Sequence, residues 1–175
     1  DNMEIITYVR QGAITHEDSL GNKGKTNAGD VQVMSAGTGV KHSEHNLEDE
    51  TTSLYQIWIK PNALNVEPRW DAMEFPKEHV ESRLNLIVGG SDEAPLFIHA
   101  DADIYAGKIE AKKEGDISDV ELTGNQIDIS ITGPNYSYEF LADILDIKKT
   151  SEASDLRIFA YMKTYKKDEK NIKLH

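Results

Sequence analysis

Short strand-like runs separated by turn residues dominate the first ninety positions of this 175-residue chain and constrain its fold more than any other feature. The runs are Ile5 to Arg10, Val31 to Met34, Val40 to Glu44, Leu54 to Lys60 and Leu84 to Val88. Gly, Asn and Asp residues between them supply the backbone conformations that tight turns require. No long amphipathic helix pattern interrupts this spacing, which predicts an all-β sandwich or barrel.

The stretch Leu54 to Ile59 carries apolar residues at both alternating sets of positions, as expected of a strand that is covered on both sides. Residues 61–82 then change character, because three prolines interrupt any regular element and Trp70, Met73 and Phe75 offer large apolar anchors. We interpret this stretch as a crossing segment that packs against the β units.

Strand-like runs resume in the second half of the chain. They are Leu96 to Ala100, Ile104 to Ile109, Gln126 to Thr132, Phe140 to Ile147 and Leu156 to Met162. These runs predict a second β unit over residues 83–162, after a first unit with its crossing segment over residues 1–82. The lysine-rich stretch 163–175 lacks the apolar periodicity of a packed helix, and we expect it to be a solvated basic tail.

The charge and composition of the chain argue against some classes of binding partner. The 31 acidic residues outnumber the 19 basic ones, and the net charge of -12 disfavours direct binding to nucleic acid or to anionic membranes. No window approaches the roughly 20 consecutive apolar residues of a membrane span, and no secretion signal is recognised. The absence of cysteine excludes disulfides and thiolate ligands and fits a reducing compartment, so we expect a cytoplasmic protein.

His42 and Glu44 are the candidate metal ligands of the first unit. Side chains at i and i+2 of a strand project to the same face and can reach one ion, whereas Lys41, Ser43 and His45 point to the other side. Imidazole and carboxylate together favour iron, manganese, nickel, cobalt or zinc over calcium or magnesium. Two ligands alone hold such a metal poorly, so the pair by itself leaves open a surface strand with two solvated side chains.

The other histidines are weaker candidates. His16 lies beside the Asp18-Ser19-Leu20-Gly21 turn, a position that predicts a structural hydrogen bond. His79, His99 and His175 have no partner at ligand spacing, and the second half of the chain contains neither a His-x-His nor a His-x-Glu motif. We therefore expect the second unit to hold no metal.

Three further side chains lie on strand faces near the pair. Gln56 and Trp58 share a face of their predicted strand, and either could line a cavity near a metal, although core packing is the favoured interpretation. Glu4 is an acid within a predicted strand, and no role is assigned to it.

Four segments in order along the chain resemble the pirins, a family of the cupin superfamily. They read MEIITYV at 3–9, HEDSLGN at 16–22, GDVQVMSAGTGVKHSE at 29–44 and LYQIWI at 54–59. The second half is similar more weakly, through residues 84–88 and through IHADADIY at 98–105. The resemblance implies an all-β bicupin, in which two jelly-roll (double-stranded β-helix) barrels follow one another with few helices.

The resemblance also implies one metal in the first barrel, usually Fe(II), held by three histidines and one glutamate. By that pattern His42 and Glu44 are two of the four ligands. The other two form a His-x-His pair that the family places just upstream of the segment beginning here at Asp1, so we expect this sequence to be truncated at its N-terminus. Nickel, manganese, copper, cobalt and zinc are alternative metals, because a mixed histidine and carboxylate set accepts several ions.

A pirin-type site implies a quercetinase-type dioxygenase that acts on a flavonol or similar small aromatic with dioxygen. Glu44 would then be both a metal ligand and the catalytic base that takes the flavonol hydroxyl proton. The alternatives are a metal-dependent regulatory protein that binds a protein partner without turnover, and a metal-free cupin scaffold.

Overall fold

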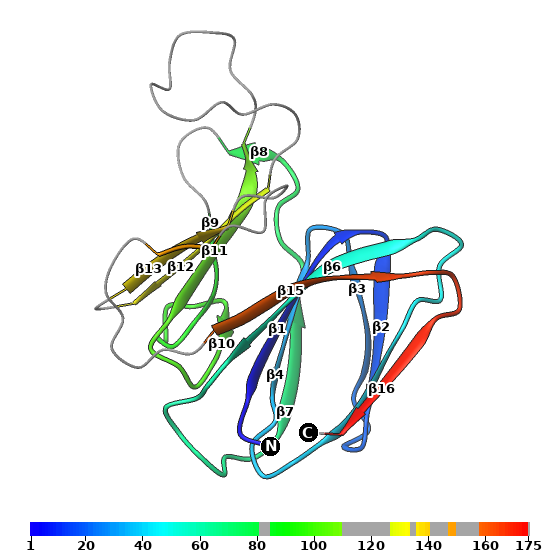
Figure 1. The fold of residues 1–175 in the computed structure, drawn as a ribbon, viewed down its shortest axis with the longest axis horizontal. Helices are drawn as coiled ribbons and strands as arrows, with labels where there is room; N and C mark the ends of the chain where they lie inside the picture. The colour runs from blue at the N-terminus through cyan, green and yellow to red at the C-terminus, as the bar shows by residue number, and fades with distance from the viewer. Residues whose placement is uncertain (81–84, 110–126, 134–135, 141–146, 150–157, 175) are drawn as a thin grey trace, which may run out of the picture.

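The computed structural model describes residues 1–80, 85–109, 127–133, 136–140, 147–149 and 158–174 (Figure 1). These residues form strands and connections but no helix, which confirms the prediction of an all-β fold. Accordingly, nothing in this part of the chain could cross a membrane as a long apolar helix.

Two sheets make up the first unit, and each of them also contains one strand from the C-terminal part of the chain. The five-stranded sheet has the order β15-β6-β1-β4-β7, and all its pairings are antiparallel. Its strands are β1 (Glu4–Gln11), β4 (Val31–Ser35), β6 (Thr52–Ile59), β7 (Arg69–Met73) and β15 (Ile158–Tyr165). The four-stranded sheet, also antiparallel, has the order β16-β5-β2-β3. Its strands are β2 (Ala13–Asp18), β3 (Lys23–Asn27), β5 (Lys41–His45) and β16 (Lys170–Leu174).

A third sheet lies on the other side of the five-stranded sheet (Figure 1). Its main path is β10-β9-β11-β12-β13-β14, and β8 pairs in parallel with β11. The strands are β8 (His79–Val80), β9 (Asn85–Gly89), β10 (Leu96–Phe97), β11 (Asp103–Ile109), β12 (Ile127–Gly133), β13 (Tyr136–Phe140) and β14 (Ile147–Lys149). The expected strand Phe140 to Ile147 falls partly on residues 141–146, which lie outside the described residues.

The five-stranded sheet is the middle layer of the molecule because both of its faces are apolar. Ile6 and Ile57 pack toward the third sheet, where Val88 and Ile104 meet them in the largest apolar cluster. On the opposite face, smaller clusters gather around Ile5 and around Val9 with Leu54. Burying an isoleucine or leucine completely contributes about 1.5–3 kcal/mol. The prediction that residues 54–59 are covered on both sides is therefore confirmed.

Strands β2 and β3 were not expected from the sequence. β3 lies at the edge of its sheet, where backbone pairing to β2 is enough to hold a strand with largely exposed, lysine-bearing side chains. β7 likewise forms within the proline-rich crossing segment by pairing with β4. The guanidinium of Arg69, the first residue of β7, lies 5.4 Å from the ring centroid of Phe97 in β10 and so links the five-stranded sheet to the third sheet.

The C-terminal residues differ from the expected solvated tail. β15 continues to Tyr165 and pairs with β6, and β16 pairs with β5 so that Asn171 lies opposite Glu44. Every extended backbone has donors and acceptors to pair, whatever its side chains are, so a strand without apolar periodicity can still complete a sheet. The expectation of a solvated tail is therefore wrong for β16, while the boundary near residue 82 remains a prediction.

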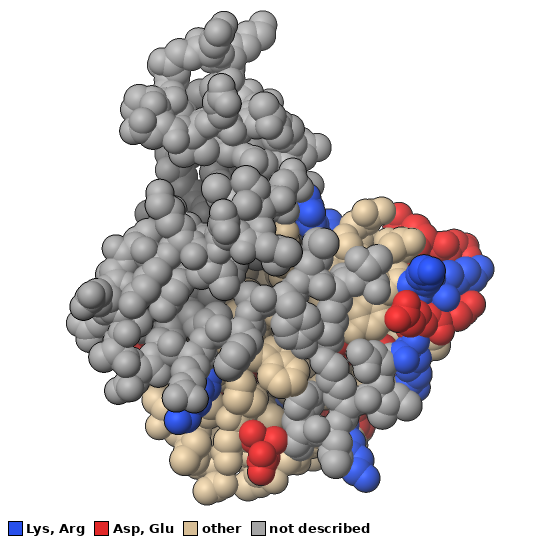
Figure 2. Space-filling view, in the orientation of Figure 1, with Lys and Arg blue, Asp and Glu red and all other residues tan. Residues whose placement is uncertain are grey.

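Ion pairs tie the β15–β16 connection to its surroundings. Figure 2 shows acidic and basic side chains together at the right-hand end of the view, where the β5–β6 and β15–β16 connections lie in Figure 1. There the ammonium of Lys167 lies 2.6 Å from a carboxylate oxygen of Asp49, and that of Lys25 lies 2.8 Å from Glu48. Such exposed pairs stabilise weakly, typically by about 0–1 kcal/mol each.

Glu4 is a buried acid on the face of β1 that looks toward the third sheet. Its side chain is 1% exposed, accepts a hydrogen bond from the Ser35 hydroxyl at 2.8 Å, and lies 3.3 Å from Nδ1 of His99. Burial raises the pKa of Glu4 above its ordinary value of 4.5, and the contacts with Ser35 and His99 oppose this shift without cancelling it. The folded chain therefore keeps the Glu4 proton to higher pH than the unfolded chain does.

We expect the stability of the protein relative to Glu4→Gln to fall as the pH rises from 4.5 through the raised pKa of Glu4. In that window the unfolded state binds fewer protons than the folded state, so the free energy of unfolding decreases with pH. Urea denaturation of both proteins between pH 3 and pH 8 measures the difference, and this range also covers the pH below 4.5 at which a lowered carboxyl pKa acts. Exposed Glu17, whose pKa is lowered by its contact with Lys23, is the control, because Glu17→Gln should give the opposite sign. A Glu4 difference that rises with pH would contradict the argument.

Candidate metal centre

Strand β5 directs His42 and Glu44 into the space between the two sheets of the first unit. The two residues are 4% and 2% exposed, while on the other face Lys41 is exposed, His45 is partly exposed and only Ser43, at 8% exposed, is buried as well. This is the alternation that the sequence predicts for a strand with one covered face. The alternative of two solvated side chains on a surface strand is therefore wrong.

Strand β2 lies beside β5 and places His16 opposite Glu44 and Asp18 opposite His42. Nε2 of His16 lies 3.1 Å from Oδ2 of Asp18, which confirms the predicted structural hydrogen bond of His16. The hydrogen bond fixes the imidazole of His16 on the inner face, next to both candidate ligands.

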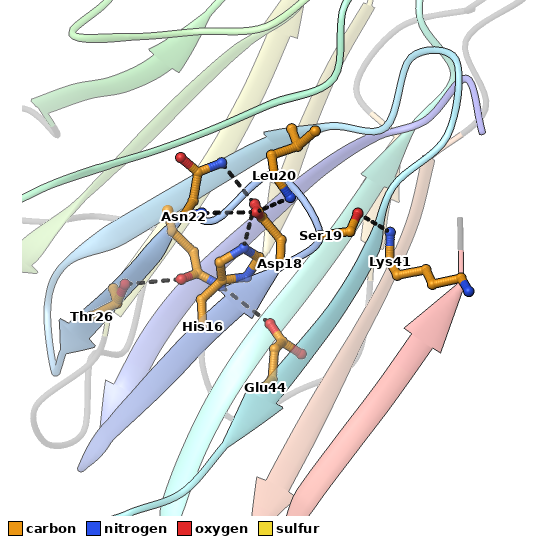
Figure 3. A network of polar contacts seen from close by, with 9 residues as sticks. His16, Asp18, Ser19, Leu20, Asn22, Thr26, Lys41 and Glu44 are labelled. Atoms are coloured by element: carbon orange, nitrogen blue, oxygen red, sulfur yellow. Dashed lines mark hydrogen bonds and ion pairs between the residues drawn. The ribbon is translucent and has the colours of Figure 1, made fainter.

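Asp18 also closes the β2–β3 turn. Its carboxylate accepts hydrogen bonds from the backbone N–H groups of Leu20 and Asn22 and from the side-chain amide of Asn22 (Figure 3). Burial alone would raise the pKa of Asp18, but the hydrogen bonds from Asn22 and His16 outweigh it, so that pKa lies below its ordinary value. The sequence segment 16–22 thus builds a rigid turn behind the site.

Three rings stack along the inner face of the four-stranded sheet. The His16 ring lies parallel to the indole of Trp70, with centroids 5.0 Å apart, and on its other side it stacks on the His42 ring at 5.5 Å. Gly24 on β3 makes room for this stack, because a Cβ atom there would overlap the Trp70 ring. The stack on His16 therefore restricts the position of the His42 ring.

We expect Gly24→Ala to destabilise the fold by about 1–3 kcal/mol, the usual cost of overpacking a filled site. The added methyl group must push Trp70 off His16. Chemical denaturation measures the cost, and near-UV circular dichroism reports the displaced indole. The same substitution made in a Trp70→Leu background is the control, since it should cost much less there. An equal cost in both backgrounds would contradict a clash with Trp70.

Glu44 is surrounded by hydrogen-bond donors from four strands. The amide of Gln56 donates to both carboxylate oxygens at 3.1 Å, and the amide of Gln32 donates to Oε1 at 3.2 Å. The Thr7 hydroxyl lies 3.4 Å from Oε1, and the Tyr165 hydroxyl donates to Oε2 at 3.0 Å. A buried carboxylate needs such donors to offset its loss of water.

Both glutamine amides are oriented by a second layer of contacts. The Thr26 hydroxyl donates to the carbonyl oxygen of Gln32 at 3.0 Å, and the indole N–H of Trp58 donates to the carbonyl oxygen of Gln56 at 3.2 Å. With the oxygen of each amide occupied in this way, its NH₂ group faces Glu44. Gln56 therefore contacts a candidate ligand directly, while Trp58 both orients Gln56 and packs in the core.

A cavity of about 870 Å³ opens at the end of the barrel where β5 begins. Its walls include Met3, Val40, Lys41 and Trp58. Val40 and Lys41 immediately precede His42, and Trp58 contacts the amide that holds Glu44. The cavity therefore lies beside the candidate site, and its wall is mixed: Met3, Val40 and Trp58 are apolar, while Asp1, Ser19, Thr38 and Lys41 are polar or charged.

The donor set of His42 and Glu44 fits a divalent transition metal, because one imidazole and one carboxylate lie on one buried face and the carboxylate has oriented partners. Within the described ranges, no group of three or more His, Cys, Asp or Glu side chains is placed to hold an ion. Of the remaining histidines, His99 lies near Glu4, His79 begins β8, and His175 is outside the described residues. The described residues thus bring two candidate ligands, His42 and Glu44, to one buried strand face.

Comparison with known proteins relates this geometry to a family. The Pirin family model matches residues 1–59, the stretch that contains β1 to β6 with both candidate ligands. A pirin-like protein of Caulobacter vibrioides is 53% identical over 112 residues, covering 63% of this chain and 48% of its own length. Quercetin 2,3-dioxygenase of Escherichia coli is 40% identical over 105 residues, covering 59% of this chain and 45% of its own.

A solved structure agrees with these matches. The Escherichia coli pirin YhhW in complex with nickel(II) superposes with a TM-score of 0.57 at 27% identity, covering 92% of this chain and 72% of that one. The predicted resemblance to the pirins is therefore confirmed, through the match of residues 1–59. The chain has the predicted cupin fold, and it spans about half the length of the curated relatives it matches.

Three of the donors to Glu44 were not predicted from the sequence. Gln32 carried a signal, because it is a polar residue inside the otherwise apolar run of β4. Thr7 lies in an equally apolar run but is too common a strand residue to stand out. Tyr165 carried no local signal, since it is 121 positions away from Glu44.

Proposed function

We propose that this protein binds a divalent transition metal, Fe(II) in the first instance, and acts as a quercetin 2,3-dioxygenase on a flavonol or similar small aromatic. The observation that carries the proposal is the buried His42 and Glu44 pair, which shares one strand face and has a shell of oriented donors around the carboxylate. Relatives named quercetin 2,3-dioxygenase and the nickel(II) complex of YhhW support it. The remaining ligands would come from a His-x-His pair encoded before residue 1.

The bound metal would supply Lewis acidity and a coordination site for the substrate and dioxygen. Glu44 would accept the hydroxyl proton of the flavonol at its carboxylate, which Gln32, Gln56 and Tyr165 hold in one orientation. The apolar part of the adjacent cavity wall, including Trp58, would contact a planar aromatic ring.

Anaerobic reconstitution tests the proposal. The protein carrying its upstream residues is loaded with iron(II), its metal content is measured, and oxygen uptake is followed after addition of quercetin. We expect about one ion per chain and uptake of oxygen that depends on quercetin. A folded, metal-loaded protein without turnover would contradict the dioxygenase function.

The same preparation separates the alternatives. A metal-loaded protein that retains a stoichiometric protein partner, loses it on His42→Ala and shows no oxygen uptake would be a regulatory binding protein. A folded protein with its upstream residues that takes up no transition ion would be a metal-free scaffold.

A further inference from the structure

Tyr165 reaches the candidate metal centre from the C-terminal end of the chain. It is the last residue of β15, is 2% exposed, and its hydroxyl donates to Oε2 of Glu44 at 3.0 Å. Thr7 and Gln32 donate to the other oxygen, Oε1. The tyrosine hydroxyl and the carboxylate are both buried, so each meets part of the other's need for a hydrogen-bond partner.

The backbone around Tyr165 is anchored to the residue that follows the candidate ligand strand. The side-chain amide of Asn46 donates to the carbonyl oxygen of Tyr165 at 3.1 Å. The backbone N–H of Asn46 donates to the carbonyl of Glu169, and the N–H of Asp168 donates to the carbonyl of Asn46, both at 2.9 Å. The side chain and the backbone of Asn46, two residues after Glu44, thus both hydrogen-bond to the β15–β16 connection.

β16 then runs along β5 itself. In its register Asn171 lies opposite Glu44 and Lys173 lies opposite His42. Strand β16 therefore supports the backbone of both candidate ligands, and β15, in the other sheet, brings the side chain of Tyr165 to the carboxylate.

We propose that Tyr165 is a positioning residue for Glu44, so that the C-terminal strands β15 and β16 form part of the metal centre. The consequence for metal binding rests on the proposed function, whereas the positioning is a property of the metal-free protein. Partners that orient a ligand in this way typically contribute about 10–100-fold to metal affinity.

Tyr165→Phe tests the proposal because it removes the hydroxyl and keeps the ring. The matched control is Tyr8→Phe, since Tyr8 is also buried, at 4% exposed, but packs in the cluster on the opposite face of the five-stranded sheet. The first readout is the carboxyl ¹³C resonance of Glu44 in the metal-free protein, assigned with Glu44→Gln. We expect Tyr165→Phe to shift this resonance and Tyr8→Phe to leave it in place.

The second readout is nickel(II) affinity, measured by titration calorimetry on the protein carrying its upstream residues. We expect Tyr165→Phe to weaken binding by about 10–100-fold and Tyr8→Phe to have no effect. If the Glu44 resonance shifts but the unaltered protein binds no nickel, the positioning stands and the proposed metal function fails. An unchanged resonance in folded Tyr165→Phe, or a shifted resonance with unchanged nickel affinity, would overturn the inference.

A measurement on the unaltered protein keeps the proposal testable if Tyr165→Phe does not fold. In an equal mixture of light and heavy water, the ring Cζ carbon of Tyr165 should give two resolved resonances, because a buried hydroxyl that is hydrogen-bonded to Glu44 exchanges its proton slowly. A single averaged resonance would overturn the proposal.

Discussion

Replacing His42 with alanine is expected to weaken transition-metal binding by at least about 100-fold, beyond the 10–100-fold typical of partners that only orient a ligand. The substitution removes the imidazole from the inner face of β5 and leaves Glu44 as the one candidate ligand on that strand. It also removes the ring that stacks on His16 at 5.5 Å. Titration calorimetry with nickel(II), on the protein carrying its upstream residues, measures the loss.

His45→Ala is the matched control for this experiment. His45 lies on the same strand, three positions along the chain, but it faces away from the site and is partly exposed. We expect this control to keep its metal affinity. Equal losses for the two variants would mean that metal binding does not depend on the inner face of β5, and the proposed centre would be wrong.

Gln56→Leu should lower the free energy of unfolding by about 2–3 kcal/mol, the range for hydrogen bonds to a charged group in a buried site. Gln56 is completely buried, and its amide contacts both oxygens of Glu44. Leucine has a similar size but no donor, so the carboxylate loses partners on both oxygens and the indole N–H of Trp58 loses an acceptor. Urea denaturation at neutral pH measures the cost.

A double-mutant cycle identifies the cause of this effect. In a Glu44→Gln background the charge is gone, so Gln56→Leu should cost clearly less than it does in the unaltered protein. If Gln56→Leu costs the same in both backgrounds, its effect arises from packing or from Trp58 and not from the carboxylate.

The local pattern of the sequence was sufficient for the strands that carry the candidate ligands. The runs at 5–10, 31–34, 40–44 and 54–60 coincide with β1, β4, β5 and β6 to within a few residues. Each of these runs is marked by apolar residues within it and by turn residues next to it, and both signals can be seen within a few positions of the sequence. β2 and β3 escaped prediction because the Lys23–Asn27 run and much of its partner are polar, and their pairing stabilises them in place of an apolar face.

The facing of His42 and Glu44 was determined by the sequence alone, because the two-residue alternation of a strand is a property of the backbone itself. The hydrogen bond of His16 to Asp18 was likewise a local consequence of the turn. Tertiary structure alone decided what surrounds the pair. Its donors come from β1, β4, β6 and β15, and they meet at Glu44 only once the registers of two sheets are set. Tyr165 reaches Glu44 because the C-terminal strand β15 comes back to pair with β6. No local pattern predicts this pairing, since it is made by backbone groups that every residue carries.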